Sequence, residues 1–462
     1  ERFYLKVPKQ ERALNKQTNK NTECLNIAVI GTGISGLSAA WLLNQGHHVT
    51  VFEQNDYVGG HSHTVIAEDE FGKIPIDTGF IVYNETNYPN LTALFDYLDV
   101  PTEASEMSFS ASLDGGLFEY SGTNLNGLFG QRSNIINPRF WRMMSGILRF
   151  YKEAPSFLAE SNSESISLGD YLRRRNYSAA FINDHLLPMG AAIWSTTSEE
   201  IQAYPAHAFI RFFQSHGLLN IIHRPSWRTV KGGSTEYVKR LSAAFEDRIF
   251  LDAVISVIRT PDNLVIKTKS GKSLLYDHVV IATHADQAIK LIVDPNDIET
   301  KLLSPWRYTQ NRTILHRDKQ FMPKETRTWS SWNFIGAQPS KRQQSFSVTY
   351  WMNKLQNLES KNDYLVTLNP SLKINPEAVI LEQEYTHPFF DAAALKSQKL
   401  LWDLQGVDRL WFCGSYFGYG FHEDGLQSGL AVAEALGSIS RPWNVVGQNN
   451  RLPFSERHGA SA

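Results

Sequence analysis

The sequence predicts an α/β fold with a doubly wound parallel sheet and a second, discontinuous α+β domain. Three glycine-rich passages predict it, and each leads into a helical pattern: Gly31 to Gly36, Gly232-Gly233 and Gly414 to Gly425. These passages lie far apart in the chain, yet all three must belong to one domain. We therefore expect two intertwined domains within the 462 residues.

The first glycine-rich turn lies in a complete strand–turn–helix–strand–acid context. Its parts are the apolar strand Ile27–Ile30, the glycines Gly31, Gly33 and Gly36, the helix Ser35–Asn44, the strand His48–Phe52 and the acid Glu53. The three glycines suit a tight turn, the close approach of a pyrophosphate and the packing of helix on strand, in that order. The N–H groups at the helix start, at Ile34 and Ser35, would face the phosphates, and Glu53 would accept hydrogen bonds from ribose.

A bare GxGxxG turn does not separate NAD from FAD, but a second glycine pair favours FAD. Gly59 and Gly60 would let the chain pass close to the diphosphate again, which resembles the extended motif of the flavin-dependent amine oxidase superfamily. That superfamily often has Arg after the pair, whereas this chain has His61. His61 and His63 as metal ligands is the alternative. We expect no metal site, because the sequence offers no partner cluster.

Composition excludes several classes of protein. The 45 Lys and Arg nearly balance the 47 Asp and Glu, so bulk charge predicts no nucleic-acid binding. The two cysteines lie far apart, which argues against a disulfide scaffold and fits a reducing compartment. No apolar run is long enough to span a bilayer. We expect a cytoplasmic protein that can lie against the inner face of the membrane, and the first residue is not Met, so a part upstream is expected to be missing.

Four further stretches are predicted to contact the cofactor. The loop holding Gly79 and Phe80 would bring backbone near the flavin ring, as in the amine oxidase superfamily, although an ordinary turn before a strand is an equal alternative. Gly233 resembles that superfamily's glycine pair near the flavin edge. The strand Ile249–Ile258 would offer Val254 to the adenine. Small Ala282 and Thr283 would let the chain turn over the dinucleotide, and His284 either lies near the site or caps the next helix.

The stretch Leu410–Leu436 is expected to hold the flavin's other end. A buried strand leads to Gly414 and Ser415, and Gly425 with Leu426 would open a helix whose N-terminus stabilises the reduced ring. His422, Glu423 and Tyr416 are the candidate catalytic groups. Asp424 is a cofactor candidate whose alternative role is the N-cap of that helix.

The remaining segments predict the second domain. Residues 138–227 are helical and rich in aromatic side chains, which suits either core packing or the wall of an apolar pocket. Residues 306–390 contain strand patterns typical of an antiparallel sheet, and Met107–Tyr120 is a predicted hairpin. We place the flavin domain at 25–85, 228–290 and 405–440, and the substrate domain at 86–227 and 291–404. A flexible leader, 1–24, with weak membrane-surface contact as its alternative, and a tail, 441–462, complete the chain.

The span from about Asn26 to Arg441 resembles the bacterial FAD-dependent oxidoreductases often encoded beside cyclopropane-fatty-acid synthases. It also resembles the oxidase-like N-terminal domain of the plant cyclopropane-fatty-acid synthases. The motifs that carry the resemblance include YVGGHSHT, DTGFIVYNETNYPNL, RPSWRTVKGGSTEYV, VVIATHADQA and CGSYFGYGFHEDGLQSG. The resemblance implies an amine-oxidase-like fold, bound FAD and a lipid or fatty-acyl substrate, with a lipid methyltransferase as a candidate partner.

Three functions follow from this resemblance and stay open. The first is FAD-dependent oxidation, as a desaturation, of a methyl-branched or otherwise modified acyl chain of a membrane lipid. The second is oxidation of a small amine or polyamine, for which Tyr416 and Tyr419 would flank the amine. The third is a flavin-bearing partner of a lipid methyltransferase without turnover. A redox-neutral isomerase is a further variant of the first.

Overall fold

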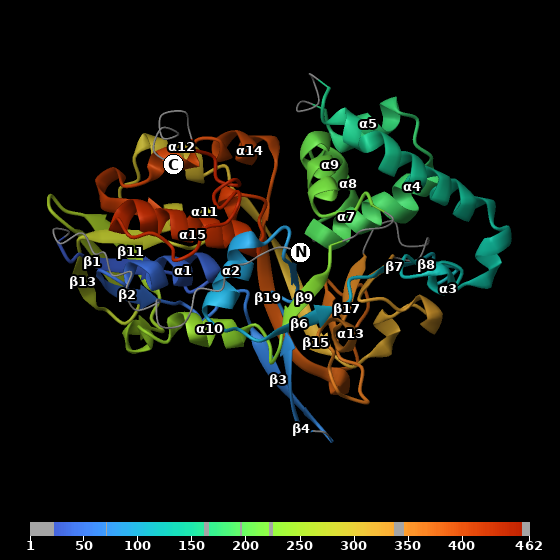
Figure 1. The fold of residues 1–462 in the computed structure, drawn as a ribbon, viewed down its shortest axis with the longest axis horizontal. Coiled ribbons are helices and arrows are strands. Elements are labelled where there is room, and N and C mark those ends of the chain that lie inside the picture. Colours follow the sequence, from blue (N-terminus) through green and yellow to red (C-terminus); the bar gives the residue numbers. More distant parts are fainter. Residues whose placement is uncertain are drawn as a thin grey trace.

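The computed structural model describes residues 23–70, 72–160, 166–194, 196–220, 225–336 and 346–454. All but the last two residues of the expected leader, and the end of the expected tail, lie outside this part. The described chain forms two lobes (Figure 1). A parallel sheet with its helices fills one lobe, and a helical layer with a mixed sheet fills the other. Among the helices described, none has the length and apolar character that crossing a membrane requires.

A five-stranded parallel sheet forms the centre of the first lobe. Its strand order is β10-β2-β1-β14-β20, with bounds Ile249–Phe250, His48–Phe52, Asn26–Ile30, His278–Ile281 and Leu410–Phe412. Every pairing within it is parallel. The strands come from three distant stretches of sequence, and three of the four neighbouring pairs in the sheet are not consecutive in the chain. The predicted α/β, doubly wound class is therefore confirmed.

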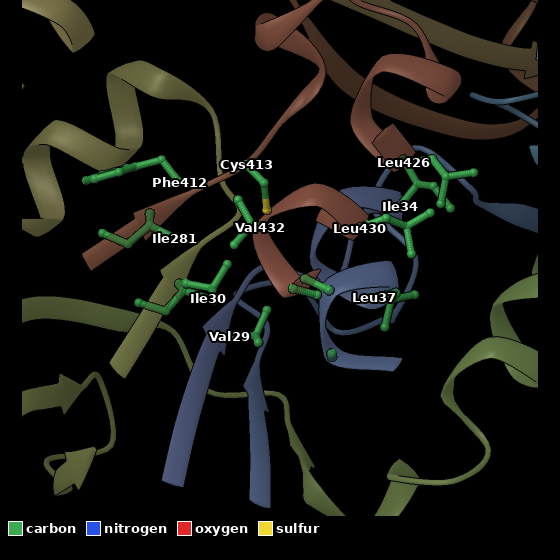
Figure 2. Packing of buried hydrophobic residues seen from close by; sticks show 14 of the residues in the cluster. Val29, Ile30, Ile34, Leu37, Ile281, Phe412, Cys413, Leu426, Leu430 and Val432 are labelled. Carbon is green, nitrogen blue, oxygen red and sulfur yellow. The ribbon is translucent and has the colours of Figure 1, made fainter. Parts of the chain in front are cut away.

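Two helices from opposite ends of the chain pack on each other beside this sheet. They are α1 (Ile34–Leu43) and α15 (His422–Gly437). Figure 2 shows their apolar side chains, among them Ile34, Leu37, Leu426 and Leu430, beside the strand residues Val29, Ile30, Ile281 and Phe412. A side-chain carbon on Gly429 would overlap the backbone oxygen of Ser35, so glycine at this position lets the two helices approach closely.

A seven-stranded sheet forms the base of the second lobe. Its order is β19-β15-β18-β17-β16-β7-β8, with bounds Val379–Phe389, Arg307–His316, Leu365–Leu368, Ser347–Trp351, Trp332–Ile335, Phe109–Leu113 and Phe118–Ser121. The predicted hairpin is confirmed as β7–β8. The strands between residues 306 and 390 pair with one another in antiparallel fashion, as predicted. One parallel pairing, of β16 with β7, adds the hairpin to this sheet. That pairing joins the two stretches predicted for this domain.

The predicted strand Ile249–Ile258 is also wrong, because the chain breaks it in two. β10 ends at Phe250 in the parallel sheet, and β11 (Val254–Arg259) begins a separate three-stranded sheet with β12 (Leu264–Thr268) and β13 (Ser273–Tyr276). The Asp252 carboxylate accepts hydrogen bonds from the Ser270 N–H and hydroxyl, at 3.1 and 2.5 Å. These bonds hold the chain in an irregular segment between the two strands.

The helical layer of the second lobe has its own apolar core. Aromatic side chains dominate it, including Phe140, Phe150, Tyr171, Phe181, Phe209 and Phe213, all buried. The helices are α4 (Pro138–Phe157), α5 (Leu168–Arg174), α6 (Ala179–Phe181), α7 (Leu187–Trp194), α8 (Ser198–Ala203) and α9 (Ala206–Ser215). Most of the aromatic density predicted for 138–227 is thus core packing.

Smaller elements join the lobes. The two-stranded sheet is β3 (Thr64–Asp69) with β4 (Gly72–Asp77), and β9 (Trp227–Val230) lies between β5 (Tyr83–Asn84) and β6 (Thr102–Ser105). The remaining α-helices are α2 (Pro89–Tyr97), α3 (Leu125–Leu128), α10 (Thr235–Ser242), α11 (Ala285–Leu291), α12 (Asp297–Leu303), α13 (Met352–Leu355) and α14 (Ala392–Gln398).

Candidate active site

The turn between β1 and α1 has the geometry that a dinucleotide phosphate requires. Gly31 has a φ of 106°, which favours glycine, and a side-chain carbon on Gly36 would overlap the Gly31 carbonyl oxygen. Gly33 is different, because nothing lies within 4 Å of the place where its side chain would begin. Gly33 is the N-cap of α1 and offers no side-chain cap, so the first N–H groups of the helix, at Ile34 and Ser35, are not capped. These residues fit the diphosphate of FAD.

Glu53 lies at the end of β2, as predicted, and is held by a residue that the sequence reasoning missed. The Thr32 N–H donates to Glu53 Oε2 at 2.9 Å, and the Thr32 hydroxyl donates to the same oxygen. Thr32 Oγ1 in turn accepts the Gly59 N–H at 3.1 Å. One buried hydroxyl therefore joins the predicted ribose ligand to the second glycine pair. The only signal in the sequence was a hydroxyl residue inside the GTG turn.

At the carboxyl ends of the parallel strands, predicted cofactor residues from distant parts of the sequence lie around the turn between β1 and α1. A side-chain carbon on Gly31 would lie 2.8 Å from the backbone oxygen of Ala282. A side-chain carbon on Gly414 would lie 3.5 Å from the Thr283 oxygen, and one on Gly425 would lie 2.8 Å from Ser35 Oγ and 3.8 Å from the Ser415 nitrogen. The structure thus brings these predicted cofactor residues together, as ligand binding at the strand ends of an open sheet requires.

The second glycine pair and the loop at Gly79 lie on the other side of this turn. A side-chain carbon on Gly60 would lie 3.0 Å from Gly33 Cα, and one on Gly79 would overlap the His61 oxygen. The Phe80 N–H donates to that same His61 oxygen at 2.7 Å. Gly60, His61, Gly79 and Phe80 therefore form one connected wall next to the fingerprint.

Asp77 connects this wall to the predicted glycine pair at Gly233. Its buried carboxylate accepts the Thr64 hydroxyl at 2.6 Å, the Ser234 N–H at 2.8 Å and the Gln356 side-chain amide at 2.9 Å. Gly233 itself packs on Thr64, where a side chain would clash. Burial raises the pKa of Asp77 to about 6, against the donors that lower it. Sequence reasoning missed Asp77 as a positioning residue.

His422 is the candidate catalytic residue that the structure places beside the predicted flavin loop. Its ring stacks on Phe80 with centroids 3.8 Å apart, and Nε2 lies 3.0 Å from Ser62 Oγ and 2.9 Å from the Tyr237 hydroxyl. Burial, with a smaller contribution from His61, lowers the pKa of His422 to about 3. The ring is neutral at physiological pH, and it can accept a hydrogen bond from a bound molecule.

Glu423 has a structural function in the geometry observed. Its carboxylate accepts hydrogen bonds from the Asn90 N–H and side-chain amide at 3.1 and 2.8 Å, and from the Leu91 N–H at 3.0 Å. The Gln427 side chain donates to it at 3.0 Å. Through these bonds Glu423 caps the first turn of α2, which has no side-chain cap of its own, and links α2 to α15. Burial raises its pKa, and these donors oppose the rise.

Asp424 is not the N-cap of α15, and the helix does not open at Gly425. The helix begins at His422, with Phe421 in the N-cap position. The Asp424 carboxylate instead accepts the Phe421 N–H at 2.7 Å and pairs with Arg451 at 3.1 Å. Gly425 and Leu426 thus lie within the first turn and the start of the second, and Leu426 is fully buried in the core (Figure 2). Their predicted contact with the flavin stays a prediction.

Tyr416 packs directly on Gly414, where an added side-chain carbon would overlap its ring, whereas Val254 lies in the separate three-stranded sheet. The Tyr416 ring packs against Trp306, with centroids 5.5 Å apart, and its hydroxyl is buried without a partner in the described structure. Burial raises the Tyr416 pKa far above its ordinary value. Val254 pairs with Thr268 in the small sheet. Their catalytic and adenine-binding assignments stay predictions.

A cluster of histidines next to the fingerprint was not predicted. The His61 ring lies 6.4 Å from that of His284 and 5.5 Å from that of His387, and its Nε2 is buried without a partner in the described structure. His284 occupies the N-cap of α11 and stacks on Tyr308 at 4.2 Å, so both roles suggested for it are met in part. Burial lowers the pKa of His284 and of His387 to about 3. In the part of the chain that is described, no group of residues could hold a metal ion.

Comparison with known proteins agrees with this geometry. The model of the family of flavin containing amine oxidoreductases matches residues 34–331. A putative flavin-containing monoamine oxidase, AofH, of Mycobacterium tuberculosis is 25% identical over 280 residues, 59% of each chain, so the match spans less than two thirds of that relative. Two solved structures share the fold over 90% of this chain. They are a putrescine oxidase bound to putrescine (TM-score 0.64, 16% identity, all of its chain) and a CLA-producing fatty acid isomerase from P. acnes (TM-score 0.62, 14% identity, 99% of its chain).

The matched segment begins inside the dinucleotide turn and extends through the second glycine pair into the second lobe. It covers more than half of the chain. The uncapped turn, the glycine contacts and Glu53 fit the cofactor of that family. The chain therefore belongs to the flavin-containing amine oxidoreductases, and its cofactor is FAD.

Proposed function

We propose that this oxidoreductase oxidises a methyl-branched or otherwise modified fatty acyl chain of a membrane lipid, introducing a double bond. Bound FAD supplies two-electron oxidation at its N5 position. The chain's own task is to orient an unactivated C–H bond and to exclude water. The neutral His422, stacked on Phe80, would help to orient the bound molecule as a hydrogen-bond acceptor, while its pKa of about 3 makes it too weak a base to take the proton.

One observation carries the preference for an apolar substrate: aromatic rings lead from the helical core to the residue next to His422. Trp194 lies 4.8 Å from Phe212, and Phe212 stacks on Phe421 at 5.2 Å. Phe421 directly precedes His422. Trp194 and Phe421 are half-buried, and this run of aromatic rings would suit contact with a long apolar chain.

The carboxylates near the site support the same preference. Glu423 accepts four hydrogen bonds from the chain, and Asp424 is paired with Arg451. Asp77 accepts donors from three segments. Each of these three acids is already engaged, so none of them is a ready partner for the ammonium group of an amine substrate. The isomerase from P. acnes has this fold and is named for its action on a fatty acid, which agrees with the proposal.

Amine oxidation is the second candidate, and the name of the monoamine-oxidase relative favours it. The test that separates the two is anaerobic mixing of the purified flavoprotein with phospholipid bearing mid-chain methyl-branched acyl groups. We expect the flavin visible band to bleach and the acyl chain to lose two hydrogens by mass. One C–C single bond becomes a double bond as a hydride and a proton leave, and the flavin is the only oxidant needed for this single turnover.

Parallel mixtures contain cyclopropane lipid, unsaturated lipid and a panel of small amines and polyamines. Bleaching by amines alone would replace the proposal with amine oxidation. A shifted double bond without mass change would indicate an isomerase. A flavoprotein that no lipid or amine reduces, but that binds a lipid methyltransferase stably, would indicate the partner role.

A further inference from the structure

One outer surface of the second lobe exposes large apolar side chains. We call it the α4 face and define it by Ile135, Ile136, Trp141, Arg142, Leu148 and Lys152. Ile135 and Ile136 end the 3₁₀ turn η2 (Arg132–Ile136), and the other four lie on α4. Ile136 is 85% exposed and Leu148 is 52% exposed. The Trp141 indole N–H donates to the Ile135 oxygen at 2.8 Å, so η2 and the start of α4 form one continuous surface.

The spacing on α4 separates this surface from the core. Trp141, Leu148 and Lys152 are spaced by seven and four residues and lie along one exposed stripe. The opposite stripe, with Phe140, Met143, Ile147, Phe150, Ala154 and Phe157, is buried in the aromatic core. α4 lies at the outer side of the helical lobe, across the molecule from the parallel sheet (Figure 1). The apolar residues of the α4 face are therefore not part of the core packing.

The charged side chains of this region are predominantly positive, although the whole chain is nearly neutral. The sequence between Glu119 and Glu153 contains no Asp or Glu, and it contains the cations Arg132, Arg139, Arg142, Arg149 and Lys152. Arg139 is paired with Asp114 and Asp184, and Arg149 with Glu153. Within the described residues, no ion pair involves Arg132, Arg142 or Lys152. The α4 face thus combines exposed apolar groups with uncompensated positive charge.

A groove beside α4 adds polar groups at the same surface. Its volume is about 470 Å³, and it is lined by Trp141, Arg142, Ser145, Arg149, Asn176 and Ser178, among others. The Arg149 guanidinium lies 4.6 Å from the centre of the Tyr177 ring and donates to the Arg175 oxygen at 2.6 Å, which fixes one wall. The Arg142 guanidinium and the two serine hydroxyls are donors that suit a phosphate group.

We propose that the α4 face docks on an anionic phospholipid bilayer. Ile136, Trp141 and Leu148 enter the boundary between headgroups and acyl chains, while Arg142 and Lys152 contact lipid phosphates. Exposed apolar side chains beside unpaired cations are the composition of interfacial membrane contacts. Lys is depleted at the centres of protein–protein interfaces, and nucleic acids offer no apolar phase for Ile136. The proposal deepens the lipid function proposed above by giving the enzyme access to acyl chains.

The test is flotation of the FAD-loaded protein with vesicles of phosphatidylcholine alone and of phosphatidylcholine mixed with phosphatidylserine. We expect binding to the anionic vesicles that weakens as salt is raised. Each cation near the surface contributes about five-fold in partitioning, so Arg142→Glu with Lys152→Glu should reduce binding by at least about 30-fold. Ile136→Ser with Leu148→Ser should reduce it by about ten-fold or more through lost apolar insertion.

Matched control variants have the same kinds of substitution at exposed positions of the first lobe. Lys269→Glu with Lys301→Glu, both exposed, and Val446→Ser with Leu275→Ser, 99% and 55% exposed, should bind as the unchanged protein does. Thermal melting and flavin absorbance check that each variant is folded. Equal binding to both vesicle types, no binding, or α4-face variants that bind like the controls would overturn the proposal. Vesicle binding needs no turnover, so it succeeds or fails independently of the acyl-chain reaction.

Discussion

The two apolar cores of the molecule are built by different means. Around the parallel sheet, backbone approaches backbone: Gly36 lies against Gly31, and Gly429 lies against Ser35. In the helical layer, large rings fill the space, and Phe150 alone neighbours Tyr171, Tyr177, Phe181 and Phe213 at 5.5–6.5 Å. The first core depends on glycines, whose missing side chains let backbone segments approach each other, whereas the second depends on the volume of its aromatic side chains.

This difference explains which functions each lobe carries. Close backbone contact leaves the N–H groups of α1 at a fixed place, so the sheet lobe can hold a phosphate group. The aromatic core packs densely on one side and leaves the outer stripe of α4 free for other contacts. Stability and cofactor binding should therefore respond differently to substitutions in the two lobes.

The largest effect is expected from Gly36→Ala. The added methyl group would overlap the Gly31 carbonyl oxygen, which belongs to backbone and cannot rotate away. We expect a loss of about 4 kcal/mol or more in the free energy of unfolding, or no folded protein, because overlap with rigid backbone must move α1. Denaturation of the purified variant, followed by circular dichroism, measures this loss.

The matched control is Gly33→Ala in the same turn. No atom lies within 4 Å of its added carbon, so the unfolding free energy of the flavin-free protein should change by less than about 1 kcal/mol. FAD affinity, measured by flavin fluorescence, should nevertheless fall by about ten-fold or more. If Gly33→Ala retained full FAD affinity, this turn would not be the diphosphate site.

In the aromatic core, Phe150→Ala should cost about 3–5 kcal/mol of unfolding free energy, because a large buried ring is removed and its rigid neighbours close the cavity only in part. FAD affinity of the folded fraction should stay within about two-fold of the unchanged protein, because the ring lies in the other lobe. Denaturation midpoints and flavin titration measure both quantities. A large loss of FAD affinity would mean that the two cores are coupled, which contradicts their separate construction.

Asp77→Asn tests the junction between the lobes. An amide nitrogen at this position would face donors from Thr64, Ser234 and Gln356, so at least one donor would lose its acceptor. We expect a loss of about 2–4 kcal/mol, the cost of unsatisfied buried groups. Asp77→Ala with Gln356→Leu, which removes two partners together, should be less damaging than the sum of the single changes. Strict additivity would show that the two side chains do not interact.

The sequence predicted the sheet lobe better than the rest for a physical reason. The spacing of Gly31, Gly33 and Gly36 determines backbone geometry over a few residues, so a local pattern is sufficient. The role of Glu423 was not predictable in this way, because its donors at Asn90 and Leu91 lie in a distant part of the chain. The start of α15 was misplaced because Phe421 has no capping side chain, and the Asp424 carboxylate caps the helix from within.

The histidine cluster was missed for the same reason. His387 lies in a long strand with no motif around it, and only the fold brings it within 5.5 Å of His61. His284 was noticed only because it follows Ala282 and Thr283. Contacts between segments so distant in sequence have no local signal, and this is why the residues that set the electrostatics of the site were found only in the structure.

The smallest effect per residue is expected from these buried histidines, and it depends on pH. Burial lowers the pKa of His284, His387 and His422 to about 3, below the value of about 6.5 in the unfolded chain. The unfolded state therefore binds more protons below pH 6.5, so stability is complete above that pH and falls as the pH decreases towards 3. At pH 5 each of these histidines should lower the free energy of unfolding by about 2 kcal/mol. Denaturation of the flavin-free protein between pH 7.5 and 5 measures how the free energy of unfolding depends on pH. His284→Asn should reduce this pH dependence. His48→Asn, at an exposed position, should leave it unchanged. A slope that His284→Asn leaves unchanged would mean that this ring gains no proton on unfolding.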